Sequence, residues 1–303
     1  MSLTTAALRQ PKRVSRLKRA AFEFFNAGAG SPLAALAIDV HFRLWKFKYH
    51  GAAFSDYYAG SIADELRRGK AHKTLGGKQF LSGSLLSAPL DVDLGAHRSR
   101  GVEYFGIAVK SGLLPLHRCI DYGCGSLRVG QHLIAHLGPQ RYLGLDIVSD
   151  FYEAGKPLLA PGTLESKRPG FMVIGPRALA AGKSFAPDFI FSFAVMKHVP
   201  PAELAAYFSS IAGMMPAGGR AVITFNRAER SVRSGAKIWD YCEGDIATAL
   251  RAADPSLAFA ISPLAAVDGR TLPRSSVLTI SRGFGPRSAQ FPRSLEMRDD
   301  EVG

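Results

Sequence analysis

The sequence predicts an α/β fold in which a mostly parallel, Rossmann-like sheet is flanked by helices. A short apolar strand at 119–122 runs into a glycine-rich turn and then into an expected helix at about 126–137. A second apolar stretch, 141–147, ends in an acid, Asp146, which follows Asp121 of the first strand by 25 residues and leaves room for one helix between the strands. Apolar strand patterns recur at 188–193 and around 225, and strands that alternate with helices are typical of parallel sheets.

The turn after the first strand is the most informative stretch. Gly123 and Gly125 have no Cβ, so their backbone can take positive φ and come close to a ligand. The helix expected to follow offers free N–H groups and a positive dipole end to a polar or anionic group. A dinucleotide-binding turn needs a third glycine where Arg128 stands, which argues against NAD and FAD.

The pattern Asp-x-Gly-x-Gly at 121–125 resembles motif I of the class I S-adenosylmethionine-dependent methyltransferases. The run Gly-Cys-Gly-Ser-Leu-Arg at 123–128 is similar to a bacterial sub-branch of that family, although most members have a glycine where Leu127 stands. The segment 187–201 resembles the motif IV region, and 214–225 resembles the following helix, proline-glycine turn and strand five. The resemblance covers about residues 98–226 and implies a seven-stranded, mostly parallel sheet, closed here by strands at 257–262 and 275–281.

The resemblance also implies the cofactor, S-adenosyl-L-methionine, and most of the residues that would hold it. Asp121 would help to hold the amino group, the glycine loop would pass under the methionine part, and Asp146 would accept both ribose hydroxyls. The cofactor-binding candidates are Asp121, Gly123, Cys124, Gly125, Asp146, Ile147 and Phe193, with Arg100 as a further candidate.

Three alternatives stay open at this point. The glycine turn can exist without a ligand, and Arg100 can be a solvated residue at a helix start. Asp146 can cap the helix that begins at Ser149-Asp150, although Asp150 is better placed for capping and would leave Asp146 to the ribose.

The expected activity is methyl transfer to an oxygen or nitrogen of a small-molecule, lipid or glycan acceptor. His198, five residues beyond Phe193, is the candidate general base, because imidazole titrates near neutral pH. A structural role for His198 is the alternative. Trp239 and Tyr241 are placed to line the acceptor pocket. The proline-rich motif of nucleobase amino-methyltransferases is missing after the 188–193 strand, and so is a Pro-Cys nucleophile.

The net charge of +13 is concentrated near the N-terminus, because residues 1–70 hold 12 Lys/Arg and 5 Asp/Glu, a surplus of seven. This distribution disfavours nucleic acid as the substrate. Three cysteines form no metal or disulfide pattern, so a reducing, cytoplasmic location is expected. The basic, acid-free stretch 1–19 leaves three interpretations open: a mitochondrial-type presequence in a eukaryote, a tether to an anionic surface, or a solvated disordered arm. No metal site is expected: His132 and His136 lack a third ligand and should lie on a solvated helix face.

The expected organisation is a basic N-terminal arm with a helical extension or lid (1–97), the methyltransferase domain (98–282) and a disordered tail (283–303). Residues 32–48 are apolar and aromatic with basic residues between them. They predict either a helix packed over the catalytic domain or an interfacial helix with Trp45, Lys46 and Lys48 at lipid headgroups. Peripheral membrane contact through residues 1–50 is therefore one possible partner interaction, and the oligomeric state stays open.

Two other functions remain as alternatives to catalysis. One is a scaffold that binds S-adenosylmethionine without transferring its methyl group. The other is a basic protein of membrane surfaces or nucleic acid, built on a methyltransferase-like core.

Overall fold

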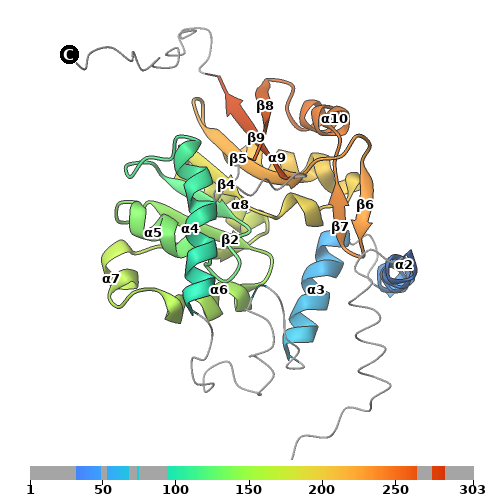
Figure 1. The fold of residues 1–303 in the computed structure, drawn as a ribbon, viewed down its shortest axis with the longest axis horizontal. Helices are drawn as coiled ribbons and strands as arrows, with labels where there is room; N and C mark the ends of the chain where they lie inside the picture. The colour runs from blue at the N-terminus through green and yellow to red at the C-terminus, as the bar shows by residue number, and fades with distance from the viewer. Residues whose placement is uncertain (1–31, 49–52, 68–73, 75–93, 265–274, 284–303) are drawn as a thin grey trace, which may run out of the picture.

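The computed structural model describes residues 32–48, 53–67, 74, 94–264 and 275–283. Residues 1–31 of the basic N-terminal region, nearly all of the expected tail, and residues 265–274 between the two closing strands lie outside these residues. Within them, the predicted fold class is confirmed (Figure 1).

A seven-stranded sheet in the order β3-β2-β1-β4-β5-β9-β8 forms the centre of the molecule. The first five strands in this order, from β3 through β2, β1 and β4 to β5, are parallel, whereas β9 runs antiparallel to both β5 and β8. The strands are β1 Cys119–Tyr122, β2 Tyr142–Asp146, β3 Gly170–Val173, β4 Phe189–Ser192, β5 Arg220–Asn226, β8 Leu257–Pro263 and β9 Ser275–Arg282. A separate two-stranded hairpin is made by β6 Val232–Gly235 and β7 Ile238–Asp240.

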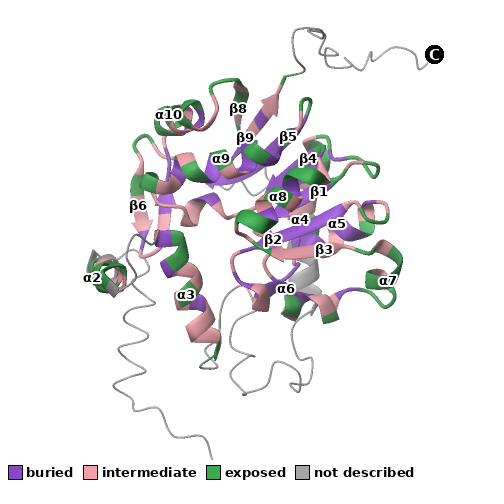
Figure 2. Ribbon diagram, turned by 180° about the vertical axis from the view of Figure 1, so that it is seen from behind, coloured by how far each residue is buried: buried purple, intermediate pink, exposed green. Residues whose placement is uncertain are grey.

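Helices cover both faces of the sheet. Helices α4 and α5 lie on one face, and α8, α9 and α10 on the other, as the two opposite views show (Figures 1 and 2). The α-helices are α2 Pro32–Lys48, α3 Phe54–Arg67, α4 Leu94–Lys110, α5 Gly130–His136, α6 Ser149–Gly155, α7 Thr163–Lys167, α8 Pro176–Phe185, α9 Leu204–Met214 and α10 Glu243–Ala253. Short 3₁₀ turns are η3 Lys156–Leu158, η4 Met196–His198 and η5 Pro201–Glu203.

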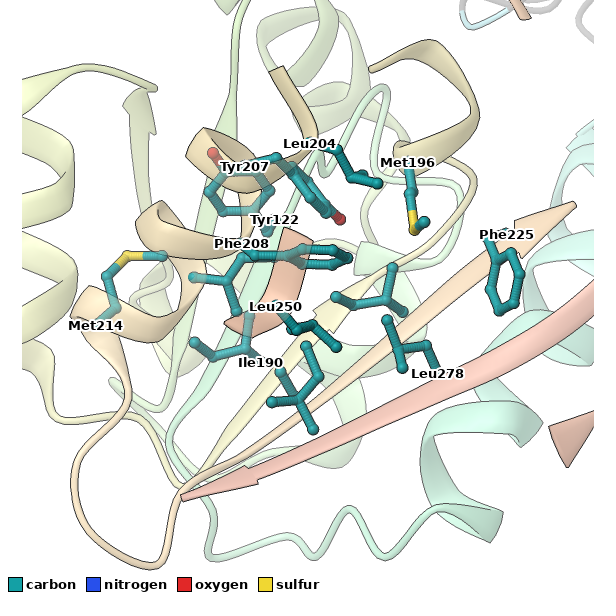
Figure 3. Packing of buried hydrophobic residues seen from close by; sticks show 14 of the residues in the cluster. Tyr122, Ile190, Met196, Leu204, Tyr207, Phe208, Met214, Phe225, Leu250 and Leu278 are labelled. Atoms are coloured by element: carbon teal, nitrogen blue, oxygen red, sulfur yellow. The ribbon is translucent and has the colours of Figure 1, made fainter. Parts of the chain in front are cut away.

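The central strands are buried on both faces, as apolar runs in a parallel sheet require. Burial in β1, β2 and β4 is continuous, and neighbouring residues of one strand enter opposite cores. Ile190 packs with Phe208 and Leu250 in the core under α9 and α10 (Figure 3). Phe191, the next residue of β4, lies with Leu133 in the core under α4 and α5. A fully buried side chain of this size stabilises the fold by about 1.5–3 kcal/mol.

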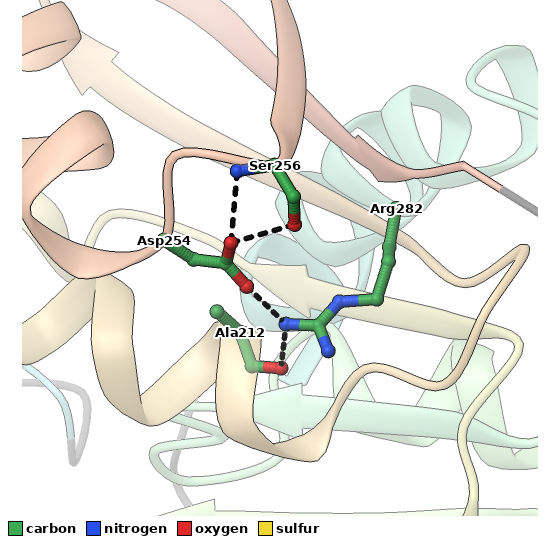
Figure 4. Close-up of polar contacts among 4 residues, drawn as sticks. All are labelled: Ala212, Asp254, Ser256 and Arg282. Atoms are coloured by element: carbon green, nitrogen blue, oxygen red, sulfur yellow. Dashed lines mark hydrogen bonds and ion pairs between the residues drawn. The ribbon is translucent and has the colours of Figure 1, made fainter. Parts of the chain in front are cut away.

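A polar cluster ties the antiparallel edge to the helices (Figure 4). Arg282, at the end of β9, donates from Nη2 to Asp254 Oδ2 at 2.7 Å and to the Ala212 carbonyl at 3.0 Å. Asp254 Oδ1 accepts from the backbone N–H and the hydroxyl of Ser256. These hydrogen bonds, first among them the one from the Ser256 hydroxyl, lower the pKa of Asp254. The cluster joins the ends of α9 and α10 to β9.

Two local features differ from expectation. The helix after the glycine turn begins at Gly130, four residues later than predicted, because the turn continues through Val129. The hairpin of β6 and β7 was not expected from the sequence. For the single helix α2, the structure favours the first of the two alternatives, a helix packed on the protein, because Trp45 packs inward with its ring 5.7 Å from that of Tyr57. No helix in the described part of the chain has the length and apolarity that crossing a bilayer demands.

Candidate functional site

The candidate site lies where the carboxyl ends of β1, β2 and β4 meet. Strand β1 is paired with β2 on one side and with β4 on the other, so the direction in which strands are added reverses between β1 and β4. Ligands of open α/β sheets bind at such a switch point, outside the carboxyl ends of the strands. The predicted residues 121–125, 146–147 and 193 all lie at this edge.

The glycine turn after β1 is held against the end of β2. The N–H groups of Gly123 and Cys124 both donate to the Leu145 carbonyl, at 2.7 and 3.0 Å. Gly123 has φ of 87°, and a Cβ there would lie 2.1 Å from Val195 Cγ2 in the segment after β4. Gly125 has φ of 52°. The backbone conformation therefore requires glycine at both positions. At Gly123, the missing Cβ also lets Val195 of the protein itself come close to the turn.

Leu127 explains why the turn is longer than expected. Its φ is 59°, in the left-handed region where glycine is the usual residue. Its side chain is nevertheless fully buried in the core under α4 and α5. The position at which most members of the resembled family have glycine thus keeps a glycine-like backbone, and core packing offsets the strain of placing leucine there.

Asp146 joins the two loops of the site. Its Oδ2 accepts from the N–H of Gly125 at 2.8 Å, and its Oδ1 accepts from the N–H of Val148 at 3.2 Å. Burial raises the pKa of Asp146 to about 6, and the backbone hydrogen bonds partly oppose that rise. The expectation that Asp146 is left entirely to a ligand needs correction, because it also holds the glycine turn, and Asp150 makes no side-chain cap on α6.

Asp121 is the second buried carboxyl group of the site, with only 3% of its surface exposed. Its Oδ2 accepts from the Tyr142 hydroxyl at 2.8 Å. Burial raises the pKa of Asp121 to about 7; the Tyr142 hydrogen bond opposes this rise and the nearby charge of Asp146 adds to it. The sequence gives no sign of the Tyr142 contact, since it forms only when β1 and β2 pair.

Phe193, just after β4, stacks on Tyr104 of α4 with ring centroids 4.0 Å apart. The Arg128 guanidinium lies over both rings, 5.3 Å from the centroid of Tyr104 and 6.0 Å from that of Phe193. Helix α4 comes this close because of Gly101, where a Cβ would lie 2.1 Å from the Arg128 carbonyl. Tyr104 and Arg128 are site neighbours that the motif alone did not indicate. Arg100 also lies in α4, but its side chain is outside the described part of the structure.

Helix α3 extends across the site. Ile62 packs with Val148 and Phe151 next to the end of β2. One turn earlier in α3, Tyr58 stacks on His198, with ring centroids 5.5 Å apart and ring planes 20° apart. Burial, followed by the charge of Asp146, raises the pKa of Tyr58 to about 12. The helix therefore connects the Asp146 end of the site with the His198 end.

His198 lies in η4 and is oriented by the hairpin. Its Nδ1 is 2.8 Å from the Lys237 carbonyl, which can only accept a hydrogen bond, so Nδ1 carries the proton. In the neutral ring the lone pair is then on Nε2. Lys237 Nζ lies 5.1 Å from the Tyr58 ring centroid and 3.1 Å from Ser61 Oγ. The Lys237 backbone and side chain thus position His198 and Tyr58 together.

The N-terminus of α3 is anchored beside this group. Glu203 accepts hydrogen bonds from the N–H groups of Phe54 and Ser55, at 3.1 Å for the latter. Farther along, the Thr74 carbonyl accepts from Ser126 Oγ at 2.5 Å, which brings this part of the chain onto the glycine turn. The segment around α3 is therefore attached to the site at both ends.

A pocket of about 260 Å³ opens between α2, α3, η5 and β7. It is lined by Asp39, Phe42, Lys46, Ala53, Phe54, Pro200, Ala202, Glu203 and Trp239. Trp239 therefore faces this pocket, and its place in an acceptor pocket stays a prediction. Tyr241 does not: it is fully buried and its hydroxyl donates to the Val199 carbonyl, so the expectation that it lines the acceptor pocket is wrong.

No group of three potential metal ligands occurs in the part of the chain that the structure describes. His132 and His136 are half-buried against Phe105 of α4, with ring centroids 6.1 and 5.3 Å away. The expectation of a solvated helix face for them needs correction.

The remaining predicted residues are at the same edge. Cys124 is buried, and its Sγ would be 3.1 Å from a Cβ at Gly144, so the side chain points to the sheet. Ile147 packs beside Val148 and α3. The structure thus brings together the predicted residues from 121–125, 146–147 and 193, while their contacts with a cofactor stay a prediction.

Among solved structures, similar folds occur in methyltransferases. The magnesium protoporphyrin IX methyltransferase of Synechocystis PCC 6803 with bound SAM is 19% identical, with a TM-score of 0.49, over 77% of this chain and 100% of that one. A methyltransferase of Methanosarcina mazei is 14% identical, with a TM-score of 0.43, over 58% and 97%. The glycopeptide N-methyltransferase MtfA complexed with sinefungin is 11% identical, with a TM-score of 0.45, over 60% and 93%. The fold assignment rests on the strand order itself.

No family model matches the chain, and no curated protein matches it either.

Proposed function

We propose that this chain is an S-adenosyl-L-methionine-dependent methyltransferase acting on an oxygen or nitrogen of a small-molecule, lipid or glycan acceptor. The observation that carries the proposal is the link between the two motif residues: the Gly125 N–H donates to Asp146 at the switch point of the sheet. This link joins a positive-φ glycine turn after β1 to a carboxylate at the end of β2, as a nucleoside-binding edge requires.

The donor set fits the proposed cofactor. Asp146 accepts from backbone N–H groups, among them those of Gly125 and Val148, and a carboxylate has about four lone-pair sites, so the group can also accept from a ribose hydroxyl. Asp121 supplies negative charge next to the turn for a ligand's amino group. Phe193, stacked on Tyr104, offers an aromatic surface on the β4 side. The cysteines are free, which supports a reducing compartment such as the cytoplasm.

When bound, the cofactor supplies a methyl group on a good leaving group, so the protein's main tasks are to position the acceptor and to remove a proton. His198 is the proposed base: its Nδ1–H is held by the Lys237 carbonyl, so that Nε2 is the proton-accepting atom. Tyr58, stacked on the ring, restricts its orientation. Under this proposal α3 is the lid that covers both the ribose-binding end and the base.

Calorimetric titration with S-adenosylhomocysteine, with NADH as the control ligand, tests the cofactor. We expect binding of the first and none of the second. Asp146→Asn should weaken binding by at least about 100-fold, since a hydrogen bond to a charged group contributes about 1.5–3 kcal/mol and two are affected. Asp150→Asn, in the first turn of α6, is the matched control and should bind normally. Unchanged affinity in Asp146→Asn would remove Asp146 from the site.

Transfer of a labelled methyl group to a panel of small-molecule, lipid and glycan acceptors tests catalysis. Once an acceptor is identified, His198→Gln should lower kcat and remove the acidic limb of the pH profile of kcat. It should leave the affinity for S-adenosylhomocysteine unchanged. Cofactor binding with no transfer to any acceptor would favour the scaffold function instead.

A further inference from the structure

Helix α2 has an exposed apolar face that the methyltransferase proposal does not use. Leu36, Val40, Leu44 and Phe47 are 59%, 49%, 65% and 83% exposed, and we call these four residues the outer stripe. Their spacings of four, four and three residues place them on one side of a helix. Large apolar side chains that line up on a surface in this way mark an interaction site.

The opposite side of α2 is already in contact with the protein, so the outer stripe is not simply a core face that lost its partner. The Phe42 ring lies 5.3 Å from that of Phe54, and the Trp45 ring lies 5.7 Å from that of Tyr57. Asp39 pairs with Arg233 of β6 at 2.7 Å. These contacts orient α2 and direct the outer stripe away from the body of the protein, at whose periphery α2 lies (Figure 1).

We propose that α2 docks the protein on an anionic lipid bilayer, with the outer stripe inserted at the level of the headgroups and upper acyl chains. A helix that lies in this interface needs an apolar face flanked by cations. Arg43 is exposed and borders the outer stripe, whereas Lys46, also exposed, lines the pocket on the protein side of α2. Asp39, the one acidic residue in the sequence of α2, is held by Arg233 on the protein side.

The surrounding charge selects the bilayer over a second copy of the chain. The chain has a net charge of +13, and its first 19 residues contain six Lys/Arg and no Asp/Glu. Two copies that met through their outer stripes would bring two Arg43 side chains and two chains of high positive charge together, whereas anionic headgroups attract positive charge. A single row of four side chains is also narrow compared with the roughly 800 Å² that each partner contributes to a standard protein interface.

This inference does not depend on the proposed methyl transfer, because none of its residues belongs to the proposed cofactor site. The test is sedimentation of the full chain with vesicles of phosphatidylcholine containing phosphatidylglycerol, compared with vesicles of phosphatidylcholine alone. We expect binding to the anionic vesicles that weakens as salt is raised. The double variant Leu44→Glu/Phe47→Glu should bind at least tenfold less.

The matched control is Leu114→Glu/Leu116→Glu, which makes the same charge change at two residues that are 55% and 74% exposed before β1. It should bind as the unmodified chain does, and melting curves of both doubles check that they fold. Equal losses in both doubles, or no vesicle binding by the unmodified chain, would overturn the proposal. The proposal would also be overturned if sedimentation equilibrium showed that the unmodified chain is a dimer and that only Leu44→Glu/Phe47→Glu dissociates it.

Fluorescence tests the orientation separately. The chain has two tryptophans, and Trp45 faces the protein while Trp239 is buried. Vesicles with brominated acyl chains should therefore bind the protein with little quenching of its tryptophan emission. Strong quenching that disappears in Trp45→Phe would mean that the other side of α2 meets the lipid, and the assignment of the outer stripe would be wrong.

Discussion

Replacing Asp121 with asparagine should stabilise the protein, increasingly so as the pH rises. The carboxyl group is 3% exposed, and burial raises its pKa from 3.8 to about 7. Because the folded state holds this proton more tightly than the unfolded state, the contribution of Asp121 to stability is most favourable below pH 3.8 and is lost as the pH rises through 7. The full loss is at most about 4 kcal/mol, at about 1.4 kcal/mol for each unit of pKa difference.

The stability lost through ionisation of Asp121 depends on the pH. About 1.5 kcal/mol of the 4 kcal/mol is already lost at pH 5, and essentially the whole 4 kcal/mol is lost at pH 8. Asparagine keeps an oxygen that can accept from Tyr142 but carries no charge. The stability advantage of Asp121→Asn over the unmodified chain should therefore grow by about 2–3 kcal/mol between pH 5 and pH 8.

Urea denaturation of both proteins at a series of pH values measures this difference directly. Asp64→Asn, at an exposed residue paired with Arg67 at 3.6 Å, is the control and should change stability by less than about 1 kcal/mol at either pH. An advantage of Asp121→Asn that is independent of pH would refute the reasoning, because it would mean that Asp121 titrates at the same pH in the folded and unfolded states.

Three other substitutions test the turn and the lid. Leu127→Gly should relieve backbone strain of about 1 kcal/mol but lose core packing of about 2–4 kcal/mol, so its urea midpoint should fall; a rise would mean that strain dominates. Gly123→Ala should lower the melting temperature, because its Cβ meets Val195 at 2.1 Å, and adding Val195→Ala should recover part of the loss. Glu203→Gln should speed hydrogen exchange in α3 by about fivefold, corresponding to the roughly 1 kcal/mol that a cap contributes; unchanged exchange would remove Glu203 as the anchor.

Much of the sheet could be predicted because its strands are short apolar stretches that the sequence alone reveals. Apolar stretches with turn residues on either side place β4 and β8 within a residue or two of their observed ends. The carboxylates at the ends of β1 and β2 could be assigned to one edge because parallel strands of a βαβ unit end together. These features depend on local composition and chain order, which a sequence displays.

What could not be predicted depends on contacts between distant residues. The contact of Tyr142 with Asp121 follows from the pairing of Cys119 with Tyr142, a register that no local pattern specifies. The late start of α5 follows from the left-handed backbone of Leu127, which is tolerated only because the side chain reaches a core formed by other helices. The stacking of Tyr58 on His198 likewise requires α3 to be docked across the site.

The choice of aspartate at position 121 argues for a ligand. A purely structural partner for the Tyr142 hydroxyl could be asparagine, which would accept the same bond without burying a charge. Aspartate is instead buried there, and burial, with the nearby charge of Asp146 adding to it, disfavours its ionisation at a cost to stability near neutral pH. Buried acids with pKa values raised in this way are typical of sites that bind a cation or move protons. If Asp121→Asn proves both more stable and unable to bind S-adenosylhomocysteine, stability and function compete at this residue, as expected when a site is built for its ligand.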